Sequence, residues 1–315
     1  MATDYLHNHK EFPELLNIIA EEMGIQPGLV EKDYWIMHVL YGLKKQGFRF
    51  ELKGGTSLSK GFGVIERFSE DIDIHISPPA ELGVNETGSK PNAINSRKEF
   101  YDWLNDNIKI DDNIENQRDK DFDNERTYIS GGIRLLYNNK TEAVQGLKEG
   151  ILLEAGFDNV APNELITISS WGYDRAIRSK IEIIDNRAID IACYHPGYTF
   201  VEKLQTIATK FRKEQETKNT GVNFMRQYYD VYSLLENQKV LDFIGTDEYH
   251  AHKEKRFSKA DKEIPILENQ TFILDDKAVR DSFIQRYKNT EALYYNGQPD
   301  FDKLIERIGK FLPSL

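Results

Sequence analysis

The spacing of hydrophobic residues predicts helices at the start of the chain and strands after them. Apolar positions recur at helical intervals over residues 12–23 and 27–43. A short strand is expected over residues 49–53 and leads into a glycine turn, and a helical turn is expected over residues 57–62. The next apolar alternation contains Asp71 and Asp73 and ends before two prolines, which is typical of a strand.

Further along, strand patterns give way to helical ones. A helix over 95–107 and an exposed charged segment over 111–124 precede strands at 127–137, 150–155 and 165–170, and helices follow at 200–214, 222–236, 278–294 and 301–311. The pattern predicts an α+β protein with N-terminal helices, a small mixed sheet and a helical C-terminal half. We place the core in residues 1–198 and a helical domain that completes the nucleotide site in residues 199–315.

Composition narrows the class of protein. Of the 315 residues, 39% are hydrophobic, which is enough for a substantial core. No run approaches the roughly 18 apolar residues of a membrane span, and the N-terminus has no signal-peptide pattern, so we expect a cytoplasmic protein without a membrane partner. The single cysteine, Cys193, lies among apolar residues, so it is expected to be buried and excludes an internal disulfide framework.

The most informative chemistry is a pair of aspartates, Asp71 and Asp73. Residues i and i+2 of a strand project from the same face, so the two carboxylates can share divalent cations while Ile72 and Ile74 enter the core. Such pairs also arise by chance in a chain with 52 acidic residues. The glycine turn before this pair makes the catalytic interpretation the stronger one, with two Mg²⁺ ions expected.

The glycine turn offers groups that suit a triphosphate. Gly54 and Gly55 let the backbone approach phosphates, and Thr56, Ser57 and Ser59 supply hydroxyl donors. A turn of two glycines is by itself an ordinary turn signal. Its position before the aspartates indicates a nucleotide site.

Glu154 is a carboxylate in an otherwise apolar strand. Burial of an unpaired carboxylate is costly, so Glu154 should have a partner or a metal. As a third carboxylate beside Asp71 and Asp73, it would hold a second metal next to an attacking hydroxyl. The expected reaction is in-line displacement at the α-phosphorus, with pyrophosphate leaving. A salt bridge with Arg134 is the structural alternative.

Three charged residues of the helical half are candidates for binding the nucleotide. Lys203 lies near the start of a helix, where a cation gains nothing from the helix dipole, and could neutralise the departing pyrophosphate. Arg226 and Asp230 are spaced i, i+4, so they can pair or frame a ligand, and Asp230 could orient Lys203. An ordinary ion pair of Lys203 with Glu202 or Asp230 is the structural alternative.

The net charge of −11 argues against non-specific coating of nucleic acid, although a local basic surface can still steer a polyanion. Two segments are rich in basic residues, namely 203–218 and 250–262. Both also contain acidic residues, so solvated helix faces are an equal alternative.

Four motifs together resemble the AbiEii/AbiGii-type nucleotidyltransferase toxins. They are Lys53-Gly54-Gly55-Thr56-Ser57-Leu58-Ser59-Lys60, Arg67-Phe68-Ser69-Glu70-Asp71-Ile72-Asp73, Glu202-Lys203-Leu204 and Tyr229-Asp230-Val231-Tyr232. The stretch Glu31-Lys32-Asp33-Tyr34-Trp35 also fits the N-terminal helix of that family. The resemblance covers roughly residues 30–235, and the gap from Gly55 to Asp71 is longer than in the minimal nucleotidyltransferase signature.

The resemblance implies a DNA polymerase β-like nucleotidyltransferase core and an enzyme that uses NTP and Mg²⁺ as a toxin of type IV toxin–antitoxin and abortive-infection systems. By motif position, Gly55, Ser57 and Lys60 would serve the phosphates, Asp71 and Asp73 the metals, and Lys203 and Asp230 the nucleotide. An RNA acceptor, most plausibly tRNA, and a cognate antitoxin are the implied partners. Two alternatives stay open: a protein or small-molecule acceptor, and a non-catalytic NTP-binding module that docks an antitoxin.

Overall fold

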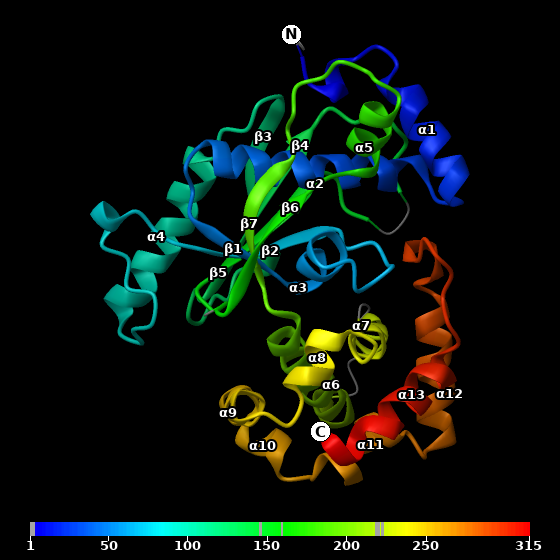
Figure 1. The fold of residues 1–315 in the computed structure, drawn as a ribbon. Helices are drawn as coiled ribbons and strands as arrows, with labels where there is room; N and C mark the ends of the chain where they lie inside the picture. Colours follow the sequence, from blue (N-terminus) through cyan, green and yellow to red (C-terminus); the bar gives the residue numbers. More distant parts are fainter. Residues whose placement is uncertain (1–3, 145–146, 159, 218–220, 222–223) are drawn as a thin grey trace. The chain divides into compact units, whose positions relative to one another are not determined.

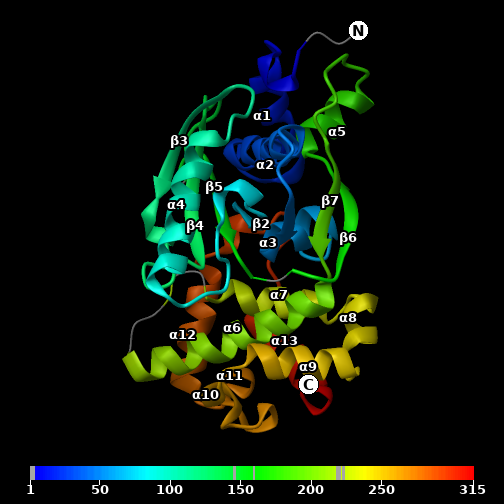
Figure 2. The ribbon, with the colours of Figure 1, turned by 90° about the vertical axis from the view of Figure 1, so that its left-hand side faces the viewer.

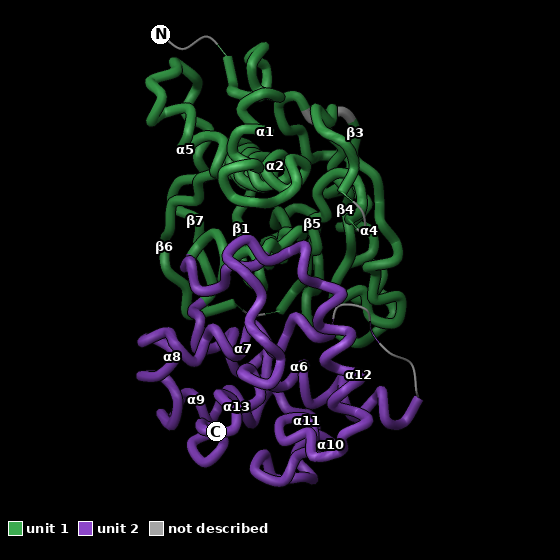
Figure 3. Tube along the Cα trace, turned by 90° about the vertical axis from the view of Figure 1, so that its right-hand side faces the viewer, with its two compact units in different colours: residues 1–61, 68–194 green, residues 62–67, 195–315 purple. Residues whose placement is uncertain are grey.

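The computed structural model describes residues 4–144, 147–158, 160–217, 221 and 224–315. The chain forms two compact units (Figure 3), the first made of Met1–Gly61 and Phe68–Tyr194, the second of Phe62–Arg67 and His195–Leu315. Two details differ from the division drawn from the sequence at residue 198. The main part of the second unit begins at His195, and the unit also includes Phe62–Arg67, which ends at the first residue of the second motif.

A mixed sheet is the centre of the first unit (Figure 1). Among the described residues it has seven strands, in the order β3-β4-β5-β2-β1-β7-β6. The strands are β1 Phe50–Lys53, β2 Asp71–Ile76, β3 Asn113–Asp119, β4 Ser130–Tyr137, β5 Ile151–Gly156, β6 Asn163–Ile168 and β7 Ala188–Tyr194. The pairs β2–β5 and β1–β7 are parallel, and the other neighbours are antiparallel.

Five helices belong to this unit in the described part of the chain: α1 Phe12–Met23, α2 Pro27–Lys45, α3 Gly54–Thr56, α4 Pro91–Asn107 and α5 Trp171–Arg178. Helix α2 is buried along most of its length. Figure 2 views α2 close to its axis, with β5 on one side and β7 on the other. An apolar helix surrounded in this way stabilises the unit by removing hydrophobic surface from water.

Helices make up most of the second unit, whose segment Phe62–Arg67 is not helical. Its helices are α6 Pro196–Thr217, α7 Arg226–Leu234, α8 Gln238–Phe243, α9 Asp247–Arg256, α10 Lys259–Lys262, α11 Gln270–Ile273, α12 Lys277–Lys288 and α13 Phe301–Phe311. Aromatic rings join them, since Tyr228 of α7 contacts Phe283 of α12 and Phe301 of α13 edge to face. Tyr228 is fully buried and belongs to the core of this unit.

The α+β fold and the helical C-terminal half are confirmed. The sheet is larger than expected because β3 and β7 were not recognised as strands. Strand β3 lies at an edge and carries charged residues, which natural sheets use to prevent edge pairing, so its sequence reads as an exposed loop. Cys193 is buried as predicted. In the described part of the chain, no helix is long and apolar enough to cross a membrane.

Candidate active site

Three neighbouring strands place a lysine and two carboxylates in one row. Lys53 of β1 lies opposite Asp73 of β2, and Asp73 lies beside Glu154 of β5. Directly paired residues of adjacent strands project from the same face, and Asp71, two residues before Asp73, shares that face. Ile72 and Ile74 are fully buried on the other face, as the alternation predicts. The register therefore brings the three expected carboxylates to one region.

The glycine turn packs directly against this row. Gly54 follows Lys53 with a φ of +68°, and a Cβ at this position would lie 2.1 Å from Oδ2 of Asp73. The left-handed φ and the close approach both require glycine. Gly54 thus connects the predicted turn and the predicted carboxylates in one structure.

We expect Gly54→Ala to lose more than tenfold in nucleotide transfer, because the new methyl group must displace the carboxylate of Asp73. The positive φ adds a backbone strain of about 1–3 kcal/mol. The measurement is the transfer rate together with the thermal midpoint. Gly24→Ala, where φ is +66° but nothing lies within 4 Å of the added Cβ, is the matched control for strain alone. If both variants keep the same rate, the contact with Asp73 is unimportant.

The hydroxyls of the turn have different environments. Thr56 donates its hydroxyl to the carbonyl of Asp71, so it fastens the turn to the start of β2. Ser57 is buried and its Oγ has no hydrogen-bond partner among the described residues. The Oγ of Ser59 lies 3.5 Å from the carbonyl oxygen of Thr56. The nucleotide contacts expected of Thr56 and Ser57 stay predictions.

Electrostatic repulsion is concentrated at Glu154. The pKa of Glu154 is raised to about 7 by burial and, to a smaller extent, by the negative charges of Asp73 and Asp71, while Lys53 lowers it. The alternative partner, Arg134, instead donates to Asp119, with Nη2 and Oδ2 2.6 Å apart. Glu154 therefore has neighbours that disfavour its charge.

A cation would relieve this repulsion, and carboxylate oxygens are the ligands that Mg²⁺ prefers. As the side chains stand in the described residues, no three His, Cys, Asp or Glu groups converge to hold a metal ion. The chemistry of the donors and their shared face fit Mg²⁺. The metal role of Asp71, Asp73 and Glu154 stays a prediction.

Helix α2 sends charged side chains toward the same region. Lys32 is buried and donates from Nζ to the carbonyl of Lys148 at 2.7 Å. Burial lowers the pKa of Lys32, and the charges of Glu70 and Asp71 oppose that shift. Asp33, also buried, accepts from Nζ of Lys60 at 2.6 Å, so the lysine expected at the phosphates is held by α2.

In the second unit, Asp230 forms ion pairs with two basic side chains. Its Oδ2 lies 2.9 Å from Nζ of Lys203, and Arg67 donates to Oδ1 from Nε at 2.6 Å and to Oδ2 from Nη2 at 2.7 Å. All three side chains are at least 87% buried, with 13% of Lys203, 5% of Arg67 and none of Asp230 exposed. Asp230 thus orients Lys203, which is also the ion pair given as the structural alternative. Arg226, the expected partner, is buried one turn earlier on α7.

The sequence motifs contain three further residues for which the sequence predicts no role, namely Arg67, Lys32 and Asp33. A signal was available for the residues of α2, because charged residues inside an apolar helical run are buried and need partners. Arg67 stands between Ile65 and Phe68 in a similar way. Its partner Asp230 is distant in sequence, so only the fold reveals the pair.

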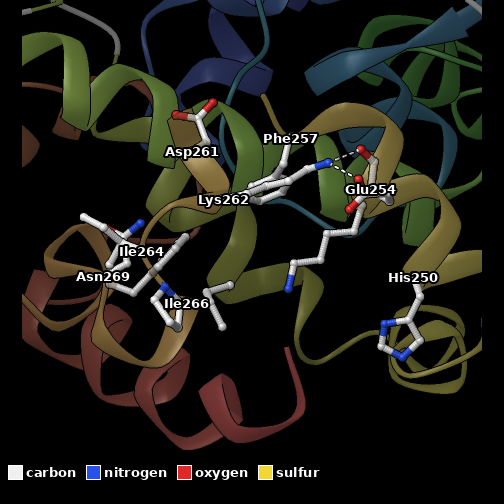
Figure 4. A pocket seen from close by; sticks show the side chains of 11 residues that line it. His250, Glu254, Phe257, Asp261, Lys262, Ile264, Ile266 and Asn269 are labelled. Carbon is white, nitrogen blue, oxygen red and sulfur yellow. Dashed lines mark hydrogen bonds and ion pairs between the residues drawn. The ribbon is translucent and has the colours of Figure 1, made fainter. Parts of the chain in front are cut away.

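Some basic residues of the second basic segment pair with acidic neighbours. Lys262 pairs with Glu254 at the rim of a cavity of about 500 Å³ in the second unit (Figure 4). His252 and Arg256 each lie 3.6 Å from Oε1 of Glu202. In the first basic segment, Arg212 lies 3.0 Å from Asp261, and Lys218 is outside the described residues. These pairs favour solvated helix faces over a polyanion surface.

A family model described as "Nucleotidyl transferase AbiEii toxin, Type IV TA system" matches residues 38–307. The chain belongs to this family. The match extends well beyond residue 235, where the resemblance of the motifs ends, and it includes most of the second unit. It begins within α2, after Glu31, Lys32 and Asp33. No curated protein matches the chain significantly.

AbiEii membership confirms the predicted nucleotidyltransferase toxin family of type IV toxin–antitoxin systems. The glycine turn, the row Lys53–Asp73–Glu154 and the Lys203–Asp230 pair all fall inside the matched region. The family establishes the class of transferase, and the acceptor and the metal are matters of proposal.

Proposed function

We propose that this AbiEii protein transfers NMP from an NTP to an RNA acceptor, with tRNA as the candidate, and that it uses Mg²⁺. The observation that carries the proposal is the packing of Gly54 against Asp73 within the row Lys53–Asp73–Glu154. A phosphate-binding turn and mutually repelling carboxylates are the two parts that metal-assisted nucleotidyl transfer needs.

In this reaction, a hydroxyl oxygen of the acceptor forms a bond to the α-phosphorus while the bond to the β-phosphate oxygen breaks. Pyrophosphate leaves with the electron pair, and the hydroxyl proton passes to a base. Mg²⁺, when bound, would neutralise phosphate charge and lower the pKa of the attacking hydroxyl.

The chain's own residues supply the rest. Asp71 and Asp73 would hold the metal ions, with Glu154 completing the set. The backbone of Gly54 and Gly55 would approach the phosphates, and Lys60 would contribute a positive charge. Lys203 is kept in one orientation by its ion pair with Asp230, which supports its proposed role in neutralising phosphate.

The test is incubation with each of four labelled NTPs and total tRNA in the presence of Mg²⁺. We expect the wild type to label RNA with at least one NTP, and Asp71→Ala to give no label because a metal-binding carboxylate is lost. Label that persists in Asp71→Ala would contradict the assigned site.

The other acceptors are resolved in the same experiment. If the label appears on protein or in a low-mass product, that molecule is the acceptor instead of RNA, and the assignment of the site residues is unchanged. Calorimetric binding of Mg²⁺–NTP with no transfer to any acceptor would indicate a non-catalytic module. Expression of the chain in cells with and without a candidate antitoxin then tests toxicity separately.

A further inference from the structure

Asp33 connects three elements of the first unit. Its Oδ1 accepts from Nζ of Lys60 at 2.6 Å, and its Oδ2 accepts from the backbone N–H of Trp171 at 2.8 Å. Lys60 lies on the π-helical turn Ser57–Gly61 that follows the glycine turn, and Trp171 begins α5. A single carboxylate of α2 therefore holds both the π-helical turn that follows the glycine turn and the N-terminus of α5.

The Asp33–Lys60 pair is costly to separate. The side chain of Asp33 is only 1% exposed, and the described residues supply Lys60 with no second carboxylate. If Lys60 moved away to a ligand, Asp33 would keep a buried charge balanced only by the Trp171 N–H. Lys60 should therefore bind any ligand without leaving Asp33.

Lys60 has donors left for that purpose. An ammonium group carries three N–H donors, and Asp33 takes one. The ammonium also lies 5.4 Å from the centre of the Trp171 ring, and 15% of the Lys60 side chain is exposed. The pair thus holds the ammonium in one place while leaving it accessible to an anion.

We propose that Asp33 is a positioning residue for phosphate binding, which acts by holding Lys60 at the glycine turn. The inference rests on the proposed function, because it takes the ligand to be the triphosphate of an NTP. Asp33 lies outside residues 38–307 that the family model matches. Its role follows from the contacts of this chain.

The direction of the change in anion affinity distinguishes a positioning role of Asp33 from the effect of its negative charge alone. Removing the negative charge of Asp33 should by itself strengthen binding of an anion through Coulomb attraction. Loss of positioning should weaken it, because Lys60 must then be ordered when the ligand binds. Weaker binding in a variant without the charge therefore supports positioning.

The experiment measures binding of magnesium tripolyphosphate by calorimetry, since this probe carries the phosphate chain that all NTPs share. Asp33→Asn keeps the size of the side chain and is expected to weaken binding about tenfold, as is Lys60→Met. The double variant should bind tripolyphosphate no more weakly than the weaker-binding single variant, because both changes disrupt the same Asp33–Lys60 pair. The KM for NTP should rise in parallel with little change in kcat.

Glu31→Gln is the matched control. Glu31 lies on the same helix, is buried, and accepts from the backbone N–H of Lys140 at 2.7 Å and of Thr141 at 3.0 Å. It should lower the thermal midpoint to a similar extent as Asp33→Asn and leave tripolyphosphate affinity unchanged.

Three results would overturn the proposal. They are unchanged or tighter binding by Asp33→Asn, additive losses in the double variant, or an equal loss in Glu31→Gln. Unchanged binding by Asp33→Asn or additive losses in the double variant would leave the proposed nucleotidyl transfer unaffected if the wild type still labels its acceptor. Absence of both tripolyphosphate binding and labelling in the wild type would instead overturn the proposed function, and this inference with it.

Discussion

Asp73→Asn should abolish nucleotide transfer while leaving the fold intact. Asp73 is the central member of the row, opposite Lys53 and beside Glu154, and it contacts Gly54 of the turn. An amide keeps the shape but removes the charge that would hold a metal ion. We expect kcat to fall by about 10²–10³-fold or more, on the scale of other losses of transition-state charge stabilisation.

The measurement is the rate of NMP transfer at saturating NTP and Mg²⁺, with the thermal midpoint of the same sample. The midpoint should not fall, because Asp73→Asn also removes a charge that repels Glu154. Glu51→Gln is the control, since Glu51 shares the face of Lys53 on β1 and is hydrogen-bonded to His75 at 2.6 Å. A similar rate loss in Glu51→Gln, or normal transfer by Asp73→Asn, would contradict the assigned centre.

Glu154→Gln should make the protein more stable and less active. The folded-state pKa of about 7 lies above the ordinary value of 4.5, so the wild type binds more protons when folded than when unfolded between these two pH values. Its free energy of unfolding therefore falls as pH rises from about 4.5 to 7. Gln carries no charge and removes this dependence.

The stability gain should be absent below about pH 4.5 and complete above pH 7, where we expect about 1–3 kcal/mol. Denaturant unfolding of both proteins at several pH values measures it. Equal stabilities at pH 8 would show that Glu154 is not strained by its neighbours. A stabilising change at an active site is common, because such sites hold like charges together.

The activity of the wild type should rise with pH through about 7 at low Mg²⁺, as Glu154 loses its proton. Higher Mg²⁺ should shift this midpoint to lower pH, because a metal ion competes with the proton for the carboxylate. The residual activity of Glu154→Gln should lack the inflection. An inflection that survives in the variant would assign the titration to another group.

Much of the site could be predicted from the sequence because its parts are local. Gly54 and Gly55 form a turn, and the i, i+2 spacing of Asp71 and Asp73 on an apolar strand places both on one face without reference to the rest of the chain. Glu154 was found because a carboxylate in an apolar strand needs a partner. Each inference used only neighbouring residues and the two-residue period of a strand.

The remaining features depend on residues far apart in sequence. The polar strand β3 is a strand only because β4 pairs with it, and its own composition indicates a loop. Arg67 meets Asp230 across 163 positions. The pairing of Lys60 with Asp33 rather than with solvent also required the position of α2.

The sequence by itself determined the family, the α+β class and the carboxylates, because motifs and strand periodicity are properties of short segments. Only the tertiary structure decided the partners of those residues. Folding places Asp73 between Lys53 and Glu154 and pairs Lys60 with Asp33. It also raises the pKa of Glu154 through burial and neighbouring negative charges. Burial and close approach of charges are created by folding, so no local pattern can specify them.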